Sequence, residues 1–232
     1  MRDTIADVEP LDNPVWRALT SHHARFAEGD GPARHYQHDV APFAALPDDP
    51  DAEAWGALAN LVGAAGTALI FRPVAATRPG DWEELFRVPA LQMVASERIG
   101  VADDALVGLG ANDVPEMLAL VARTQPGPFF ERTHELGSYI GLRDRDGLVA
   151  MAGERMCGPR FSEISAVCTD DRARRQGLAS RLVRALAAII EGRGDTPILH
   201  VVADNAPAIR VYDALGFETR AAFDVVVLRA PV

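Results

Sequence analysis

The sequence predicts a mixed α/β fold, and three observations indicate it. A strand over 162–168 leads through a glycine-containing turn into an amphipathic helix over 178–191. A second strand, over 198–203, leads into a helix over 206–215 that has a capping residue before it and a glycine after it. The dipeptide Asp146-Gly147 lies between two apolar runs and supplies the turn chemistry of a hairpin.

The other elements follow from local patterns of apolar residues and chain breakers. In the first half we expect a helix over 53–62, a strand over 67–71, a helical turn over 81–86 and a strand over 90–95. In the second half we expect a strand over 106–108, a helix over 114–123 capped by Asp113, a short helix over 129–134, a hairpin of 138–142 with 148–155, and a last strand over 225–228.

Composition excludes several classes of protein. The chain has 232 residues and a net charge of −10, which disfavours a general binder of nucleic acid or of an anionic membrane. Every basic residue is an arginine, and the absence of lysine excludes P-loop NTPases, kinases and pyridoxal phosphate enzymes. Cys157 and Cys168 have no metal-ligand spacing, and with the acidic N-terminus they predict a cytoplasmic protein. The uncharged run over 54–71 is interpreted as a buried helix followed by a strand rather than a membrane span.

The turn before the helix over 178–191 has the character of an anion site. A strand that enters a helix through a glycine leaves backbone N–H groups free at the positive end of the helix dipole, which suits a phosphate. Residues 172–184 contain five arginines and no acidic residue. Gly177 and Ala179 carry too little side chain to keep a ligand from the backbone. A solvated arginine-rich loop is the alternative interpretation.

Two motifs at compatible spacing resemble those of the GNAT superfamily of acyl-CoA-dependent N-acyltransferases. Arg174-x-x-Gly177-x-Ala179 resembles the family's pyrophosphate loop, and Tyr212-x-x-Leu215-Gly216-Phe217 resembles its Y-x-x-x-G-F helix. The resemblance covers about 102–228 and implies a GNAT-type twisted mixed sheet flanked by helices. The segments RTHELGSYIGL, LVAMAGERM and SEISAV are similar to the glycine N-acyltransferase-like branch. We therefore expect a GNAT acyltransferase domain over 102–232, preceded over 1–101 by a smaller α+β half that resembles a degenerate copy.

The resemblance implies acetyl-CoA, or another short acyl-CoA, as cosubstrate, and it implies no metal. Backbone N–H groups at the helix start and neighbouring arginines would hold the pyrophosphate. The edge of the preceding strand would pair with the pantetheine arm, because its unpaired backbone groups need a partner. The expected cofactor contacts are Ala166, Val167, Cys168, Thr169, Arg174, Arg175, Gln176, Gly177, Leu178, Ala179, Ser180, Asn205, Ala208 and Tyr212.

Acyl transfer requires a neutral amine, a donor for the developing oxyanion and a proton for the leaving thiolate. The resemblance implies that Tyr212 is the general acid and that a backbone N–H near Val167 is the oxyanion donor; core packing is the other interpretation of Tyr212. Glu163 stands where many family members hold a carboxylate base, and a structural or surface glutamate is the alternative. The further candidates for the base are Glu154, His134 and His200, the last favoured as a packed strand residue.

The predicted reaction is transfer of an acetyl or other short acyl group from CoA to an amine, by direct attack in a ternary complex. The first alternative is a catalytically silent module that binds acyl-CoA. The second, an unrelated nucleotide-binding domain, lacks both the G-x-G-x-x-G and the G-K-[ST] motifs. The loop over 124–129 resembles the family's acceptor-side segment, although Phe129 and Phe130 can equally serve to bury it. A small-molecule or peptide amine is the expected acceptor, and both its identity and a homodimer stay open.

Overall fold

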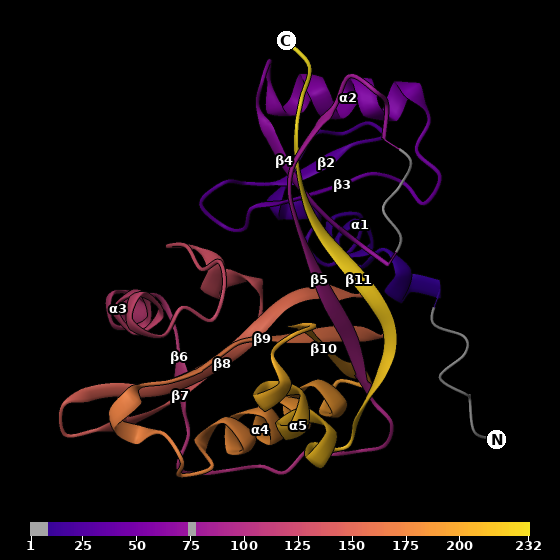
Figure 1. The fold of residues 1–232 in the computed structure, drawn as a ribbon. Helices are drawn as coiled ribbons and strands as arrows, with labels where there is room; N and C mark the ends of the chain where they lie inside the picture. Colours follow the sequence, from indigo (N-terminus) through magenta and orange to yellow (C-terminus); the bar gives the residue numbers. More distant parts are fainter. Residues whose placement is uncertain (1–8, 74–77) are drawn as a thin grey trace.

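The computed structural model describes residues 9–73 and 78–232. These residues form one eleven-stranded mixed sheet with five α-helices around it, which confirms the predicted mixed α/β fold (Figure 1). The helices are α1 (Pro14–Leu19), α2 (Ala52–Val62), α3 (Val114–Thr124), α4 (Leu178–Gly192) and α5 (Ala206–Leu215). The strands are β1 (Ala27–Glu28), β2 (Arg34–Tyr36), β3 (Phe43–Ala45), β4 (Thr67–Arg72), β5 (Glu83–Ala95), β6 (Val107–Leu109), β7 (Tyr139–Asp144), β8 (Gly147–Gly158), β9 (Phe161–Thr169), β10 (Thr196–Val202) and β11 (Phe217–Arg229).

Two parallel crossovers organise the sheet, whose order is β1-β2-β3-β4-β11-β5-β10-β9-β8-β7-β6. Helix α2 joins the parallel strands β3 and β4, and α4 joins the parallel strands β9 and β10. The last long strand of each half pairs with a strand of the other half: β5 of the first half pairs with β10, and β11 of the second half pairs with β4. The expected division at 101/102 therefore does not separate two sheets. The two halves have similar strand orders, β1-β2-β3-β4-β11 and β6-β7-β8-β9-β10-β5, with one strand fewer in the first. Their origin from one duplicated unit stays a prediction.

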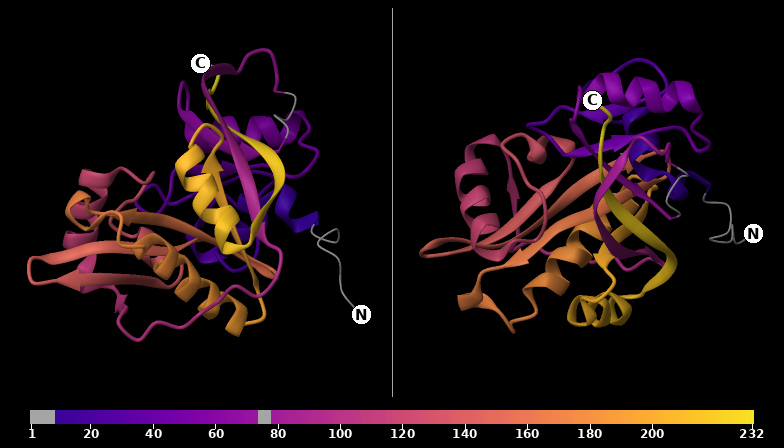
Figure 2. Two further views of the ribbon diagram at one scale, coloured as in Figure 1. Left: turned by 60° about the horizontal axis from the view of Figure 1, so that its bottom comes forward. Right: turned by 45° about the horizontal axis from the view of Figure 1, so that its top comes forward.

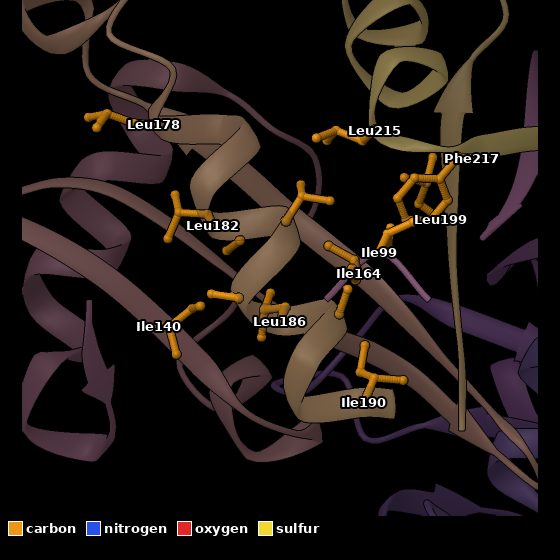
Figure 3. Close-up of a cluster of buried hydrophobic side chains, with 14 of the residues drawn as sticks. Ile99, Ile140, Ile164, Leu178, Leu182, Leu186, Ile190, Leu199, Leu215 and Phe217 are labelled. Carbon is orange, nitrogen blue, oxygen red and sulfur yellow. The ribbon is translucent and has the colours of Figure 1, made fainter. Parts of the chain in front are cut away.

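The larger core lies between the sheet and α4. Leu182, Leu186 and Ile190 recur at helical spacing, are fully buried, and pack in one cluster with Ile164 and Leu199 of the sheet (Figure 3). Burying each of these side chains contributes roughly 1.5–3 kcal/mol relative to leaving it in water. The cluster therefore fixes α4, and with it the turn at its N-terminus, against β9 and β10.

Some expected elements differ from the structure because long-range pairing decides them. The expected helical turn over 81–86 is instead the start of β5, which pairs with β11 along its whole length (Figure 1). The same pairing extends the expected strand over 225–228 to Phe217–Arg229. Where a short helix is expected over 129–134, the chain forms a 3₁₀ turn over Thr133–Leu136. Asp113 does not cap α3, because its carboxylate accepts from Gly110 N–H and binds Arg143.

The helices gather in separate places around the sheet. The right view of Figure 2 shows α2 at one end of the molecule and α4 with α5 near the other. The uncharged run over 54–71 divides between α2 and β4, as expected. Within the described ranges, none of the helices is long and apolar enough to cross a membrane.

Candidate active site

A cleft opens where β9 and β10 diverge. Their parallel pairing runs only from Thr196↔Phe161 to Ile198↔Glu163, and beyond this point the two strands separate. The space between them has a volume of about 490 Å³. It is lined by Thr124, Gln125, Pro126, Gly127, Arg155, Ile164, Ser165, Ala166, Val167, Cys168, Thr169, Arg174, Ala179, His200, Val201, Val202, Asn205, Ala208 and Tyr212. Backbone groups on the facing edges of the strands are thus left for a ligand to pair with.

A β-bulge in β9 lies beside this cleft. Ser165 pairs with Gly153 and Cys168 with Met151, so one extra residue is accommodated in β9 between the two pairs. Ala166 adopts a left-handed conformation there, with φ of 52°, which is strained for a residue that has a Cβ. The bulge interrupts the ladder to β8 at Ala166 and Val167, where an oxyanion donor is expected.

The N-terminus of α4 presents free backbone donors. Arg175 and Gly177 have φ of 63° and 74°, and this pair of left-handed residues turns the chain into the helix. Arg181 N–H donates to Gly177 O at 3.1 Å, so the N–H groups of Leu178, Ala179 and Ser180 precede the first bond within the helix. A Cβ at Gly177 would meet no atom within 4 Å, so glycine serves the backbone conformation here rather than close packing.

The arginines of the turn divide into two groups. Arg172 binds Asp144 and Asp146, Arg181 binds Asp103, and Arg184 donates to Ile99 O. Arg174 makes only a highly exposed pair with Asp171, which is weak because water screens it. Arg175 is exposed and has no side-chain partner within residues 9–73 and 78–232. Two of the five arginines are therefore available to a phosphate.

Helix α5 forms the wall of the cleft that carries Tyr212. Asn205 caps this helix by accepting from Ala208 N–H at 3.2 Å, as expected, and Gly216 ends it with φ of 96°. The Tyr212 ring packs against Phe217, with ring centroids 6.1 Å apart. Burial, with a smaller contribution from the charge of Glu163, raises the pKa of Tyr212 to about 12. The phenol therefore keeps its proton at neutral pH and can donate it.

Glu163 does not line the cleft, and its arrangement does not fit the expected role of general base. The carboxylate is fully buried and accepts two bonds from Arg155, at 2.8 and 2.6 Å, and a third from His200 Nδ1 at 2.8 Å. Burial would raise its pKa, but Arg155 and His200 outweigh burial and lower the pKa to about 2. A carboxylate that is this weakly basic and has its oxygens occupied holds other groups in place.

His200 lines the cleft but is also held at both ring nitrogens. Its Nδ1 faces Glu163, and its Nε2 lies 3.0 Å from Gln92 Nε2. The Gln92 amide is oriented by Leu11 O and by Arg220, which donates to Gln92 Oε1 at 2.7 Å. His200 Nε2 therefore accepts and Nδ1–H donates, which is the neutral ring. Burial lowers the pKa of His200 despite the nearby carboxylate, consistent with this state.

The remaining candidate bases lie outside the cleft lining. Glu154 is buried and binds Arg193, Ser162 Oγ and Ser138 N–H. His134 lies in the 3₁₀ turn, where its Nδ1 contacts Glu131 O at 3.0 Å. Across the described ranges, no group of His, Cys, Asp and Glu side chains has the arrangement needed to hold a metal ion.

Most of the expected cofactor residues come together at the cleft. Nine of them line it, namely Ala166, Val167, Cys168, Thr169, Arg174, Ala179, Asn205, Ala208 and Tyr212. The side chain of Leu178 is instead part of the core, so only its backbone faces the turn. The other four expected residues lie in the turn and at the start of α4 but do not line the cleft, namely Arg175, Gln176, Gly177 and Ser180.

Arg155 lines the cleft, although no role was expected for it from the sequence. It belongs to the segment LVAMAGERM, where Glu154 and Arg155 place two charges in a run of otherwise apolar, buried residues. A charge in such a strand needs a buried partner, so a charged residue at this position could have indicated a buried ion pair from the sequence alone. The partner, Glu163, comes from the neighbouring strand β9.

The fold and the cleft agree with comparisons to known proteins. A family model described as FR47-like protein matches residues 139–225, which include most of the cleft lining. A crystal structure from Novosphingobium aromaticivorans, described as an acetyltransferase of the GNAT family, is 37% identical with a TM-score of 0.87, and the match covers 97% of this chain and 100% of that one.

Two curated relatives match a shorter region. The L-amino acid N-acetyltransferase AaaT of Escherichia coli (strain K12) is 41% identical over 64 residues, which are 26% of this chain and 40% of that protein. The mycothiol acetyltransferase of Corynebacterium jeikeium (strain K411) is 36% identical over 66 residues, which are 28% of this chain and 19% of that protein. The chain therefore matches less than half of the length of either relative. Together with the full-length structural match, these similarities show that the chain belongs to the GNAT family of acetyltransferases.

Proposed function

We propose that this protein transfers an acetyl group from acetyl-CoA to the amine of a small molecule or peptide, by direct attack in a ternary complex. The observation that carries the proposal is the cleft between β9 and β10. Its unpaired strand edge runs toward the free N–H groups of α4, and Tyr212 belongs to the facing wall. Placement in the glycine N-acyltransferase-like branch and a cytoplasmic location are parts of the same proposal.

The residues present fit acetyl-CoA, which supplies the acetyl group as an activated thioester. The N–H groups of 178–180, together with Arg174 and Arg175, suit its pyrophosphate. The edge of β9 over 166–169 offers backbone partners to the uncharged amides of the pantetheine arm. Ala179 and Ala208 line the cleft with small side chains, which leaves the arm room to approach the backbone.

Two groups of the chain and a water molecule then act on the reacting atoms. A backbone N–H near Val167, beside the bulge, donates to the developing oxyanion. The Tyr212 hydroxyl donates its proton to the departing sulfur, because its raised pKa keeps it protonated until that step. The amine loses its proton to water in the cleft, since Glu163 and His200 are both occupied.

Without a side-chain base, the acceptor's own pKa matters. An amine with a pKa near 10.4 is neutral in about one molecule in 2500 at pH 7, which costs about 4.6 kcal/mol. An amine with a pKa near 7.8 costs only about 1 kcal/mol. The site therefore favours amines of low pKa, with rates that rise with pH up to the pKa of the acceptor.

Tyr212→Phe tests the proposal. We expect kcat for thiol release with an amine panel to fall at least tenfold, while CoA affinity measured by isothermal titration stays within about twofold. Unchanged turnover would contradict the general-acid role. If the unaltered protein binds CoA but releases thiol with no amine, the protein is instead the silent module that binds acyl-CoA. This second candidate is favoured by the hydrogen bonds of Glu163 and His200, which leave neither side chain free to act as a base.

A further inference from the structure

The side chain of Arg155 lines the inner end of the cleft. The pairing of β9 with β10 ends at Glu163↔Ile198, so the cleft narrows there and opens toward Thr169 and the start of α4. Arg155 on β8 lies beside the narrow end, because the preceding residue pairs with Ile164. This cation therefore lies at the opposite end of the cleft from the expected phosphate contacts.

The guanidinium of Arg155 has donors left over. Nε donates to Glu163 Oε2 at 2.8 Å, and Nη2 donates to Oε1 at 2.6 Å. Nη1 has no hydrogen-bond partner among the residues that the structure describes. The ring of Phe43 lies 5.0 Å from Cζ, and the whole side chain is only 14% exposed. Nη1 itself is not fully enclosed, so it faces the space of the cleft, where an acceptor on a ligand can take the place of water.

A second polar group without a partner lies near Arg155. The Tyr139 hydroxyl is enclosed, and within the described ranges nothing hydrogen-bonds to it. Its ring crosses β8 at Gly153, two residues before Arg155, where an added Cβ would lie 2.2 Å from the ring. Glycine thus allows the ring to lie across the strand. Burial raises the pKa of the hydroxyl, so it stays a neutral donor close to the charge of Arg155.

We propose that Arg155 binds a carboxylate of the acceptor, so that the acceptor is an amine that also carries a carboxylate, as amino acids do. The proposal rests on the acetyl transfer proposed above and adds the class of substrate. The free Nη1 hydrogens and the second Nη2 hydrogen can meet a carboxylate side by side. Such planar recognition is what distinguishes arginine from lysine.

The surrounding residues fit this role. Glu163 holds the guanidinium from the side away from Nη1, and His200 in turn holds Glu163, so both act as positioning residues. A carboxylate at the inner end of the cleft would direct the amine of the same molecule outward, toward Val167 and Tyr212. The acceptor and the thioester would then meet beside the bulge in β9.

The test compares L-amino acids with their C-terminal amides, which lack the carboxylate. Thiol release from acetyl-CoA is measured for each pair over a range of pH, and kcat/KM is expressed per neutral amine, because the carboxylate raises the pKa of its own α-amine above that of the amide. On this scale the protein is expected to prefer the acid at least tenfold for its best pair. Arg155→Lys keeps a positive partner for Glu163 but loses the Nη1 donors, so the preference should fall to near unity through a lower rate with the acid. Arg143→Lys is the matched control, because Arg143 binds Asp113 and Glu116 outside the cleft and should leave the preference intact.

A binding measurement separates this inference from the proposed function. The best amino acid is titrated into protein saturated with CoA, and Arg155→Lys should weaken its binding at least tenfold without changing CoA affinity. Equal kcat/KM per neutral amine for acids and amides, or a preference that Arg155→Lys leaves unchanged, would overturn the carboxylate assignment while acetyl transfer stands. If no amine releases thiol, the proposed function fails. Carboxylate binding that depends on Arg155 would then still support the inference, and its absence would overturn it.

Discussion

Replacing Glu163 by Gln distinguishes a positioning carboxylate from a catalytic base. Glu163 is fully buried, and its pKa is lowered from 4.5 to about 2. A lowered pKa means that the charged form stabilises the fold at pH values above about 4.5, and that this stabilisation is lost as the pH falls toward 2. The shift corresponds to roughly 3 kcal/mol. Removing one partner of a buried ion pair costs about 3–5 kcal/mol, which is consistent with that figure.

Urea unfolding at pH 7 measures this free energy, and a double-mutant cycle shows how much of it belongs to the pair of Arg155 and Glu163. We expect Glu163→Gln to lower the free energy of unfolding by about 3 kcal/mol, since Arg155 then lacks its counter-charge. The double variant Arg155→Met, Glu163→Gln should lose less than the two single changes together, by at least about 1 kcal/mol, because it leaves no unpaired charge.

The kinetics of Glu163→Gln provide the refuting result. With a pKa near 2, Glu163 is ionised throughout the range from pH 5 to 9, so the pH profile of kcat should keep its shape in the variant. If the variant unfolds with unchanged free energy, or if it loses an acid limb from that profile, Glu163 is a titrating base and the reasoning above is wrong.

Three other predictions follow from the ion pairs and caps. Arg175→Ala should weaken CoA binding about tenfold in a calorimetric titration, whereas Arg172→Ala should not, because Arg172 is paired with Asp144 and Asp146; equal losses would refute the phosphate assignment. The same titration should give one CoA per chain. Helix α2 is the crossover helix of the first half, as α4 is of the second, but Asp51 caps its N-terminus and Glu53 adds negative charge there, so this helix start should not bind a phosphate; two sites would contradict this. Burial lowers the pKa of His23 from 6.5 to about 4, so stability is full above pH 6.5 and should fall by about 2 kcal/mol between pH 7.5 and 5; His23→Gln should flatten this loss, and an unchanged slope would exclude His23 as its source.

Local patterns were sufficient for much of the second half of the chain. The hairpin of β7 and β8, the cap at Asn205 and the helix over 178–191 depend on neighbouring residues, and the structure has them where they are expected. The same holds for the turn at Gly177, whose left-handed conformation depends on a residue type visible in the sequence. These features are set within a few residues along the chain, so periodicity and capping rules apply to them directly.

The sequence by itself determined the mixed α/β class, the glycine-containing turn and the motif helix that carries Tyr212. Only the tertiary structure decided that β5 and β11 exchange between the halves, because their pairing joins segments more than 100 residues apart. It also decided that Glu163 is held by Arg155 and His200 instead of facing the cleft. Whether a carboxylate is a base or a support depends on which groups surround it in space, and here Glu163 on β9 meets Arg155 from β8 and His200 from β10.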